Sequence, residues 1–307
     1  MSSSVIYPQS LQPGDMIGVV CPAGYMPLEK TDQAVKTLQE WGFRVRLGRT
    51  VGHQHHYFSG TDAERKDDLQ AMLDDPEIKA ILCGRGGYGT GRIIDQLDFS
   101  VFLQQPKWII GFSDITILHA HLLAKYNIAS LHAPMANAFN DGGSEGPYVL
   151  SLRDMLTGKD SMYVVGGHPF NRPGKATGTL VGGNLALVAH LIGTPSEVDT
   201  QGAILFLEDV GEYIYNIDRM MYQLKRAGKL EGLSGLIFGG FTDTKDTAIP
   251  FGQTIEEVLQ EHVKEYDFPV CFHFPVSHDT PNYALISGGS YRMDIDAEGC
   301  TLQLLNR

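Results

Sequence analysis

The sequence contains few cysteines and no long apolar run. Its 307 residues include only four cysteines, and these stand far apart at positions 21, 83, 271 and 300. No paired cysteine spacing indicates a zinc site, so we expect no metal. No apolar stretch approaches the length of a membrane span. The first residues also lack the positive and apolar segments of a secretory signal, which favours a cytoplasmic protein with no membrane partner.

Positive charge is scarce as well. The chain has 24 Lys and Arg against 36 Asp and Glu, a net charge of −12. Because nucleic-acid binding depends on cations that neutralise phosphates, this balance argues against a nucleic-acid partner. The remaining composition, with 43% hydrophobic residues, is typical of a globular protein. The length suits one large or two medium domains.

Strand and helix patterns alternate through the first half of the chain. Short apolar runs at 17–21, 43–47, 79–83 and 107–112 indicate strands, and the segments between them indicate helices. This alternation predicts an α/β fold with a mostly parallel sheet covered on both faces, of flavodoxin-like or Rossmann-like type.

The periodicity fails between about 136 and 175, where Gly, Pro and Asn interrupt it. We therefore predict an N-terminal domain over 1–136, a connector over 137–175 and a C-terminal domain over 176–307. Strand patterns at 204–207 and 269–272 alternate with helix patterns in this last part, and the tail reads as an antiparallel hairpin. We expect a second α/β domain with a mixed sheet and an antiparallel tail.

Ser113 stands between a predicted buried strand (107–112) and a predicted helix (114–123). A serine at such a junction lies on a sharp turn at the carboxyl edge of the sheet, with helix amides available to a developing oxyanion. The segment is Gly-Phe-Ser-Asp. It resembles the α/β-hydrolase elbow in the way the serine is placed between strand and helix, but it does not match the elbow motif G-x-S-x-G. The alternative is that Ser113 only caps the helix.

A serine nucleophile needs a base, and the base needs an orienting carboxylate. His278 follows a predicted strand in a proline-flanked loop, and Glu208 ends the apolar run 204–207. Taken singly, His278 reads as a surface histidine and Glu208 as a solvated or helix-capping acid. Together with Ser113 they form a candidate triad.

The segment Gly-Arg-Gly-Gly-Tyr-Gly at 84–89 matches the dinucleotide pattern G-x-G-x-x-G. It follows the third predicted strand rather than the first, however, and no acid-ended strand follows about 20 residues later. We favour a second use, in which loop amides form half of an oxyanion hole and the amide of Asp114 forms the other half. Arg85 is a candidate to hold a substrate carboxylate.

These segments together resemble one known family. Ser113, Glu208 and His278 occur in that chain order, accompanied by Pro-Gly-Asp at 13–15, Cys-Pro-Ala at 21–23, Arg-Gly-Gly-Tyr-Gly at 85–89 and Gly-Gly-Asn at 182–184. Over nearly its whole length the sequence resembles the LD-carboxypeptidases, the serine peptidases of murein tetrapeptide recycling in bacteria.

The resemblance implies a Ser-His-Glu triad split between two domains, a homodimer, and no cofactor. It places the oxyanion hole on the amides of Gly87 and Asp114, and leaves open whether Gly86 shares that role or contacts substrate. The implied reaction releases the terminal D-Ala from L-Ala-D-Glu-meso-diaminopimelate-D-Ala through an acyl-enzyme on Ser113. Two alternatives remain: a microcin C-type peptidyl-nucleotide hydrolase, which shares the fold, and a non-catalytic nucleotide-binding module.

Overall fold

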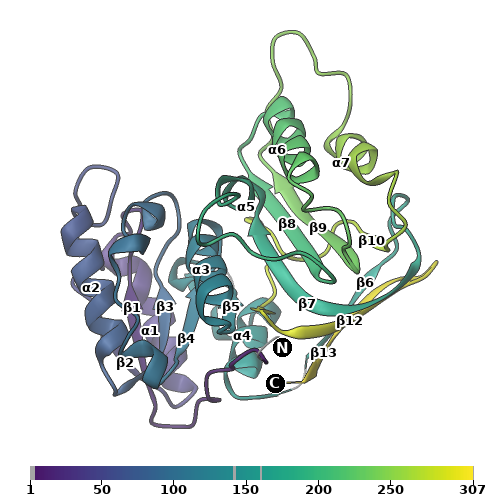
Figure 1. Ribbon diagram of the computed structural model, residues 1–307. Coiled ribbons are helices and arrows are strands. Elements are labelled where there is room, and N and C mark those ends of the chain that lie inside the picture. Colours follow the sequence, from purple (N-terminus) through teal and green to yellow (C-terminus); the bar gives the residue numbers. More distant parts are fainter. Residues whose placement is uncertain (1–3, 141–142, 160, 307) are drawn as a thin grey trace. The chain divides into compact units, whose positions relative to one another are not determined.

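The computed structural model describes residues 4–140, 143–159 and 161–306. These residues form two compact units (Figure 1). Unit 1 comprises the described part of 1–160 together with Tyr283–Ile286, and unit 2 comprises the described part of 161–282 and 287–307. Each unit is built around its own sheet.

The described residues of the first sheet form six strands in the order β11-β5-β4-β3-β1-β2. They are β1 (Met16–Val20), β2 (Arg44–Leu47), β3 (Ile78–Cys83), β4 (Trp108–Gly111), β5 (Ser130–His132) and β11 (Leu285–Ser287). Strands β1 to β5 pair in parallel. Their order is that of flavodoxin-like folds, in which ligands bind beyond the carboxyl ends of the strands.

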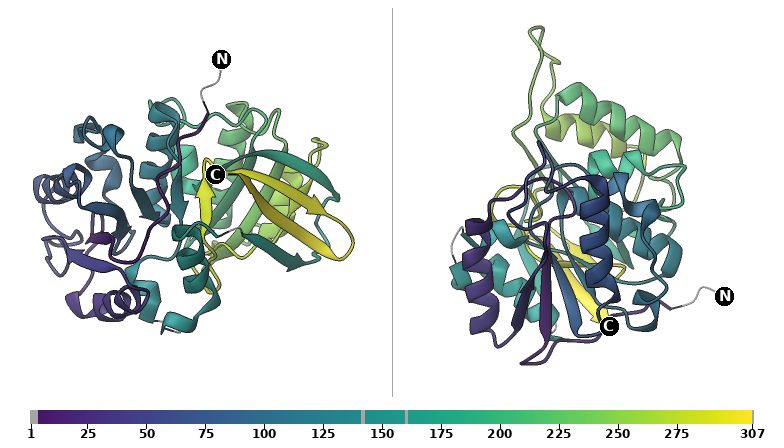
Figure 2. Two further views of the ribbon diagram at one scale, coloured as in Figure 1. Left: turned by 90° about the horizontal axis from the view of Figure 1, so that it is seen from below. Right: turned by 90° about the vertical axis from the view of Figure 1, so that its left-hand side faces the viewer.

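Helices cover the sheet of unit 1 on both sides. They are α1 (Asp32–Glu40), α2 (Asp62–Asp74), α3 (Thr116–Tyr126) and α4 (Pro147–Leu156). The right-hand view of Figure 2 shows α1 on one side of the strands and α2 on the other. Helix α2 begins sharply because Thr61 and Glu64 form a reciprocal capping box. The predicted mostly parallel, doubly covered sheet is confirmed.

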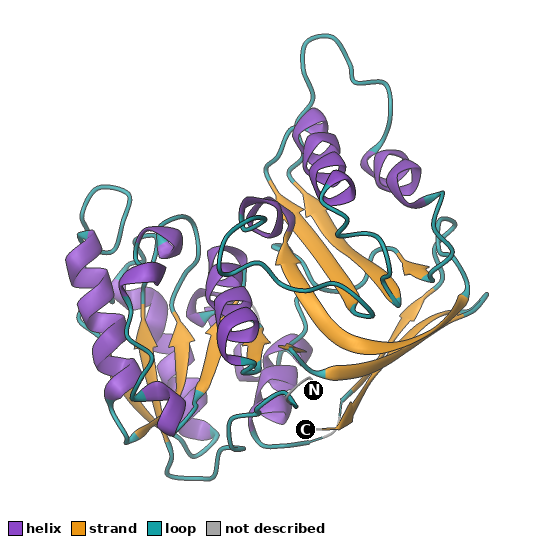
Figure 3. Cartoon of the chain, viewed as in Figure 1, coloured by secondary structure: helices purple, strands orange, loops and turns teal. Residues whose placement is uncertain are grey.

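Unit 2 contains a seven-stranded mixed sheet within its described residues, in the order β10-β9-β8-β7-β12-β13-β6 (Figure 3). The strands are β6 (Met162–Gly166), β7 (Gly174–Asn184), β8 (Ile204–Val210), β9 (Gly235–Thr242), β10 (Val270–Cys271), β12 (Ser290–Ile295) and β13 (Gly299–Asn306), and the helices are α5 (Leu185–His190), α6 (Ile214–Arg226) and α7 (Ile255–Val263). Strands β7 to β10 pair in parallel and β12, β13 and β6 antiparallel, which confirms the mixed sheet and the antiparallel tail.

Two segments differ in detail from the sequence patterns. The helix expected from Asp114 begins with a 3₁₀ turn over Ser113–Ile115 before α3. The range 137–175, predicted as a connector, carries α4 and β6. The predicted domain boundaries stay a prediction. In the described part of the chain, no helix is long and apolar enough to span a membrane.

Candidate active site

Ser113 lies just beyond the end of β4, on a tight turn into α3. Its φ is +62°, in the left-handed region that a non-glycine residue adopts at an energetic cost. Gly111 makes the turn possible, because a Cβ on it would lie 2.9 Å from Cγ1 of Ile115. In the nucleophile elbow, too, the serine lies in a strained turn between a strand and a helix.

The glycine loop after β3 lies directly against this turn. A Cβ placed on Gly86 would be 2.8 Å from Cβ and 3.0 Å from Oγ of Ser113, and 3.4 Å from the amide nitrogen of Asp114. Gly87 adopts a φ of +99°. Within the described residues, neither the amide of Gly87 nor that of Asp114 donates a hydrogen bond. Both amides are therefore available to an acceptor from outside the protein.

Arg85 is exposed, and one of its guanidinium nitrogens is engaged. Its Nη1 donates to the carbonyl oxygen of Tyr25 at 2.7 Å. This contact fixes the direction of the side chain at the rim of the glycine loop. The described residues accept no other hydrogen bond from the guanidinium, which leaves donors for a carboxylate ligand.

Glu208 and His278, two of the candidate residues, lie in contact in unit 2. Oε2 of Glu208 lies 2.7 Å from Nδ1 of His278. The Glu208 side chain is fully buried within β8, whereas the His278 side chain keeps 17% of its surface exposed. The carboxylate therefore orients the imidazole, and Nε2 is the candidate base.

Two glycines of β9 position the loop that carries His278. The amide of Gly240 donates to the carbonyl of Val276 at 2.9 Å, so the loop runs against the strand. A Cβ on Gly239 would overlap the carbonyl oxygen of Val276, and one on Gly240 would lie 2.7 Å from Cβ of Ser277. Sequence reasoning missed both glycines, although a Gly-Gly pair inside a strand is a signal of close backbone approach.

The pKa of His278 is raised above its ordinary value. Burial alone disfavours the imidazolium, but the hydrogen bond to Glu208 and the negative charges of Glu208, Asp209 and Asp279 outweigh it. The pair is thus arranged to stabilise a proton on His278, as a general base requires once it has accepted one.

Asn184 and Asp209 form a buried polar pair beside Glu208. Nδ2 of Asn184 donates to Oδ1 of Asp209 at 2.9 Å, and Oδ2 of Asp209 accepts from the amide of Ala186 at 3.0 Å. Burial raises the pKa of Asp209 to about 6. Asn184 pairs in register with Glu208 between β7 and β8, so the pair braces the strand end that presents the acid. The Gly-Gly-Asn segment at 182–184 is part of the resemblance, but the sequence alone assigns Asn184 no role.

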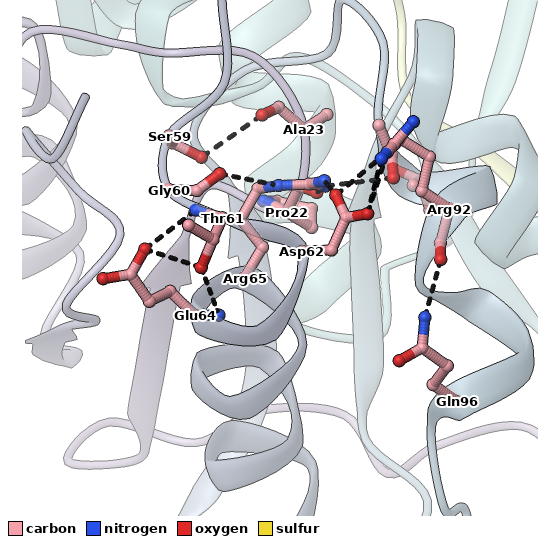
Figure 4. Close-up of polar contacts among 12 residues, drawn as sticks. Pro22, Ala23, Ser59, Gly60, Thr61, Asp62, Glu64, Arg65, Arg92 and Gln96 are labelled. Atoms are coloured by element: carbon pink, nitrogen blue, oxygen red, sulfur yellow. Dashed lines mark hydrogen bonds and ion pairs between the residues drawn. The ribbon is translucent and has the colours of Figure 1, made fainter. Parts of the chain in front are cut away.

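A buried arginine, drawn with Pro22, Gly60 and Asp62 in Figure 4, supports the glycine loop. The Arg65 side chain, on α2, is fully buried and pairs with Asp62. Its Nη1 donates to the carbonyl oxygens of Pro22 and Gly89, at 2.5 and 3.0 Å, and its Nε donates to that of Gly60 at 3.3 Å. The sequence gives no signal for this, because the surrounding helix is highly charged and has the pattern of a solvated one.

Comparison with known proteins assigns the family. Residues 17–133 match the LD-carboxypeptidase N-terminal domain, and residues 177–293 match the LD-carboxypeptidase C-terminal domain. A probable murein peptide carboxypeptidase of Bacillus subtilis is 37% identical over 94% of this chain and 91% of its own. The chain belongs to the LD-carboxypeptidase family. As a member it is a serine-type carboxypeptidase, a hydrolase.

Solved structures share the fold of this LD-carboxypeptidase along almost its full length. The muramoyltetrapeptide carboxypeptidase of Oxalobacter formigenes aligns with a TM-score of 0.85 and 28% identity, covering 94% of this chain and 98% of the other. A microcin C7 self immunity protein in complex with adenosine monophosphate aligns with a TM-score of 0.86 and 25% identity, covering 98% and 99%. The resemblance seen in the sequence is thus confirmed, and family membership favours an enzyme over a non-catalytic module.

Proposed function

We propose that this enzyme releases the terminal D-Ala from the murein tetrapeptide L-Ala-D-Glu-meso-diaminopimelate-D-Ala. The observation that carries the proposal is the conformation of Ser113. This serine has a strained φ of +62° and packs against Gly86 of the glycine loop. The buried Glu208–His278 pair supplies the matching base and orienting acid. The relatives named for murein peptides support the choice of substrate.

In the proposed mechanism, Oγ of Ser113 attacks the carbonyl carbon of the diaminopimelate residue while Nε2 of His278 takes the hydroxyl proton. Glu208 holds the imidazole in the tautomer with its proton on Nδ1 and stabilises the imidazolium. The amides of Gly87 and Asp114 stabilise the oxyanion. His278 then protonates the leaving nitrogen of D-Ala, and water hydrolyses the acyl-enzyme by the same route.

Arg85 gives the proposed site its preference for a chain end. Its free guanidinium donors suit the carboxylate of the leaving D-Ala, and Gly86 is the second residue that we propose contacts substrate there. Replacing Arg85 with Ala should raise KM for the tetrapeptide and leave kcat nearly constant, because the contact is present in both ground state and transition state. An unchanged KM would exclude this role.

The likeness to the microcin immunity protein supports a second candidate activity, hydrolysis of a peptidyl-nucleotide. Both activities use the same serine chemistry, so they differ in the group that leaves. Comparing kcat/KM for the tetrapeptide with kcat/KM for an aminoacyl sulfamoyl adenosine separates them. A higher value for the nucleotide would replace the murein assignment.

The decisive test is release of D-Ala from the purified tetrapeptide by the wild type and by Ser113→Ala, with EDTA present. The proposal expects metal-independent release by the wild type and its loss in the variant. A folded but inactive wild type would contradict the murein substrate, and an active Ser113→Ala enzyme would reduce Ser113 to a helix cap.

We also propose that the enzyme acts in the cytoplasm, in peptidoglycan recycling, as a homodimer. The family resemblance supports these points. Light scattering in solution should give about twice the 33.7 kDa of one chain.

A further inference from the structure

One peptide unit of the glycine loop is held on both sides by charged side chains. The carbonyl oxygen of Gly89 accepts from Nη1 of Arg65 at 3.0 Å. The amide of the next residue, Thr90, donates to Oδ2 of Asp114 at 2.7 Å. The Gly89–Thr90 peptide therefore lies between a buried guanidinium and the carboxylate of the residue that follows Ser113.

Arg65 binds three separate stretches of chain at once. Pro22 follows β1, Gly60 precedes α2, and Gly89 ends the loop after β3. A rigid planar fork with five donors suits such a task, whereas an ammonium group is a single point charge. Burying a guanidinium completely is costly unless its donors are satisfied, and here each of its three nitrogens donates to a carbonyl or to Asp62.

The loop that Arg65 holds needs this support. Gly87 and Gly89 adopt φ values of +99° and +144°, which other residues rarely adopt. Glycine-rich segments of this kind are intrinsically mobile in the absence of contacts. A Cβ on Gly89 would lie 2.7 Å from Nη1 of Arg65, so the guanidinium packs directly against the backbone.

We propose that Arg65 is a positioning residue for the oxyanion site: it fixes the loop at Gly89 so that Gly86 and Gly87 keep their places against Ser113. It also places a positive charge near the buried carboxylate of Asp114, whose own amide is the second oxyanion donor. The inference rests on the proposed function, since it assigns Arg65 to the same site. Arg65 itself touches no substrate.

The test compares Arg65→Met and Arg65→Lys with the wild type by steady-state release of D-Ala, well below the melting temperature of each variant. Loss of one oxyanion donor lowers kcat by about 10²–10³-fold. We expect Arg65→Met to lower kcat about 100-fold and to keep KM within about threefold of the wild type. The kcat of Arg65→Lys should lie between those of the wild type and Arg65→Met. Labelling of Ser113 by a fluorophosphonate, whose phosphoryl oxygen occupies the same hole, should slow in parallel.

Arg92→Gln is the matched control. Arg92 shares the carboxylate of Asp62 with Arg65, but its side chain is 47% exposed and, among the described residues, donates no hydrogen bond to Pro22 or Gly89. Arg92 reaches Gly89 through its backbone amide, which donates to the Gly89 carbonyl at 3.1 Å and is kept in the variant. This variant should keep kcat within about twofold. A purely structural role of Arg65 predicts a lower melting temperature with an unchanged kcat.

The outcomes separate the inference from the proposed function. A wild type that releases no D-Ala contradicts the proposed substrate, and the labelling rates of the same variants then still test Arg65. A folded Arg65→Met that keeps kcat and labelling rate within threefold of wild type overturns the inference. If Arg65→Met does not fold, Arg65→Lys decides: a fall of at least about tenfold supports the inference, and wild-type rates overturn it.

Discussion

Replacing Gly86 with Ala tests the geometry of the nucleophile most directly. The added methyl would lie 2.8 Å from Cβ and 3.0 Å from Oγ of Ser113. Carbon atoms in contact normally stay about 3.5–4.0 Å apart, so the loop and the serine must separate by roughly 0.7 Å. A misplacement of about 1 Å at a reacting atom costs on the order of 100-fold in rate, so we expect kcat to fall about 30- to 100-fold.

The same substitution should leave the fold intact. Gly86 does not adopt a positive φ, so alanine is compatible with its backbone. Overpacking of this kind destabilises a protein by about 1–3 kcal/mol, and thermal unfolding should show this as a modest fall in melting temperature. The effect should therefore appear mainly in catalysis, as a lower kcat and slower labelling of Ser113 by a fluorophosphonate.

Gly166→Ala is the control, because a Cβ there meets no atom within 4 Å and its φ is also not positive. Gly166→Ala should match the wild type in both rate and stability. If Gly86→Ala retains kcat within threefold, Ser113 does not need its observed position and the assignment of the nucleophile is wrong.

The remaining predictions concern the base, its loop and the buried histidines. Glu208→Gln should lower kcat by about 10⁴-fold, as expected when the orienting acid of a triad becomes an amide. Since Glu208 raises the pKa of His278, the acid limb of kcat/KM should also move to lower pH in any residual activity. Gly240→Ala should push Ser277 and the His278 loop away from β9, and should lower kcat and slow Ser113 labelling in parallel; wild-type turnover would show that the loop adapts. Burial lowers the pKa of His119 and of His121 to about 4, so the stability that their neutral forms contribute above about pH 6.5 should be lost as the pH falls toward 4. Urea unfolding of His119→Gln should show a shallower loss over that window, and an equal slope would mean that His119 does not drive it.

Sequence patterns were sufficient for the architecture because its determinants are local. Buried parallel strands such as β3 and β8 are short apolar runs, and α7 shows its helical period over Ile255–Val263. The start of α3 was harder to locate. There the left-handed Ser113 imposes a 3₁₀ turn first, and this strained residue overrides the helix propensity of its C-terminal neighbours.

The candidate catalytic residues could be selected because each comes after an apolar run of the sequence, whereas the residues that position them could not. Arg65, Gly239 and Gly240 act through contacts with chain segments distant in sequence, such as Pro22, Gly89 and Val276, apart from the local bond to Gly60. No periodicity encodes such contacts. A charged residue in an acidic helix gives the same local pattern whether it faces solvent or binds three carbonyls.

The environment of Glu208 explains why this acid suits a base that must gain a proton. Its Oε2 is bonded to His278, but its Oε1 is buried with no partner among the described residues. Asp209, its neighbour, adds negative charge rather than compensating it. A buried carboxylate that is only half satisfied is costly, and that cost falls when the neutral imidazole becomes an imidazolium. In the proposed mechanism, the step in which His278 accepts the proton of Ser113 therefore relieves an electrostatic penalty that the Glu208–His278 pair carries before substrate binds.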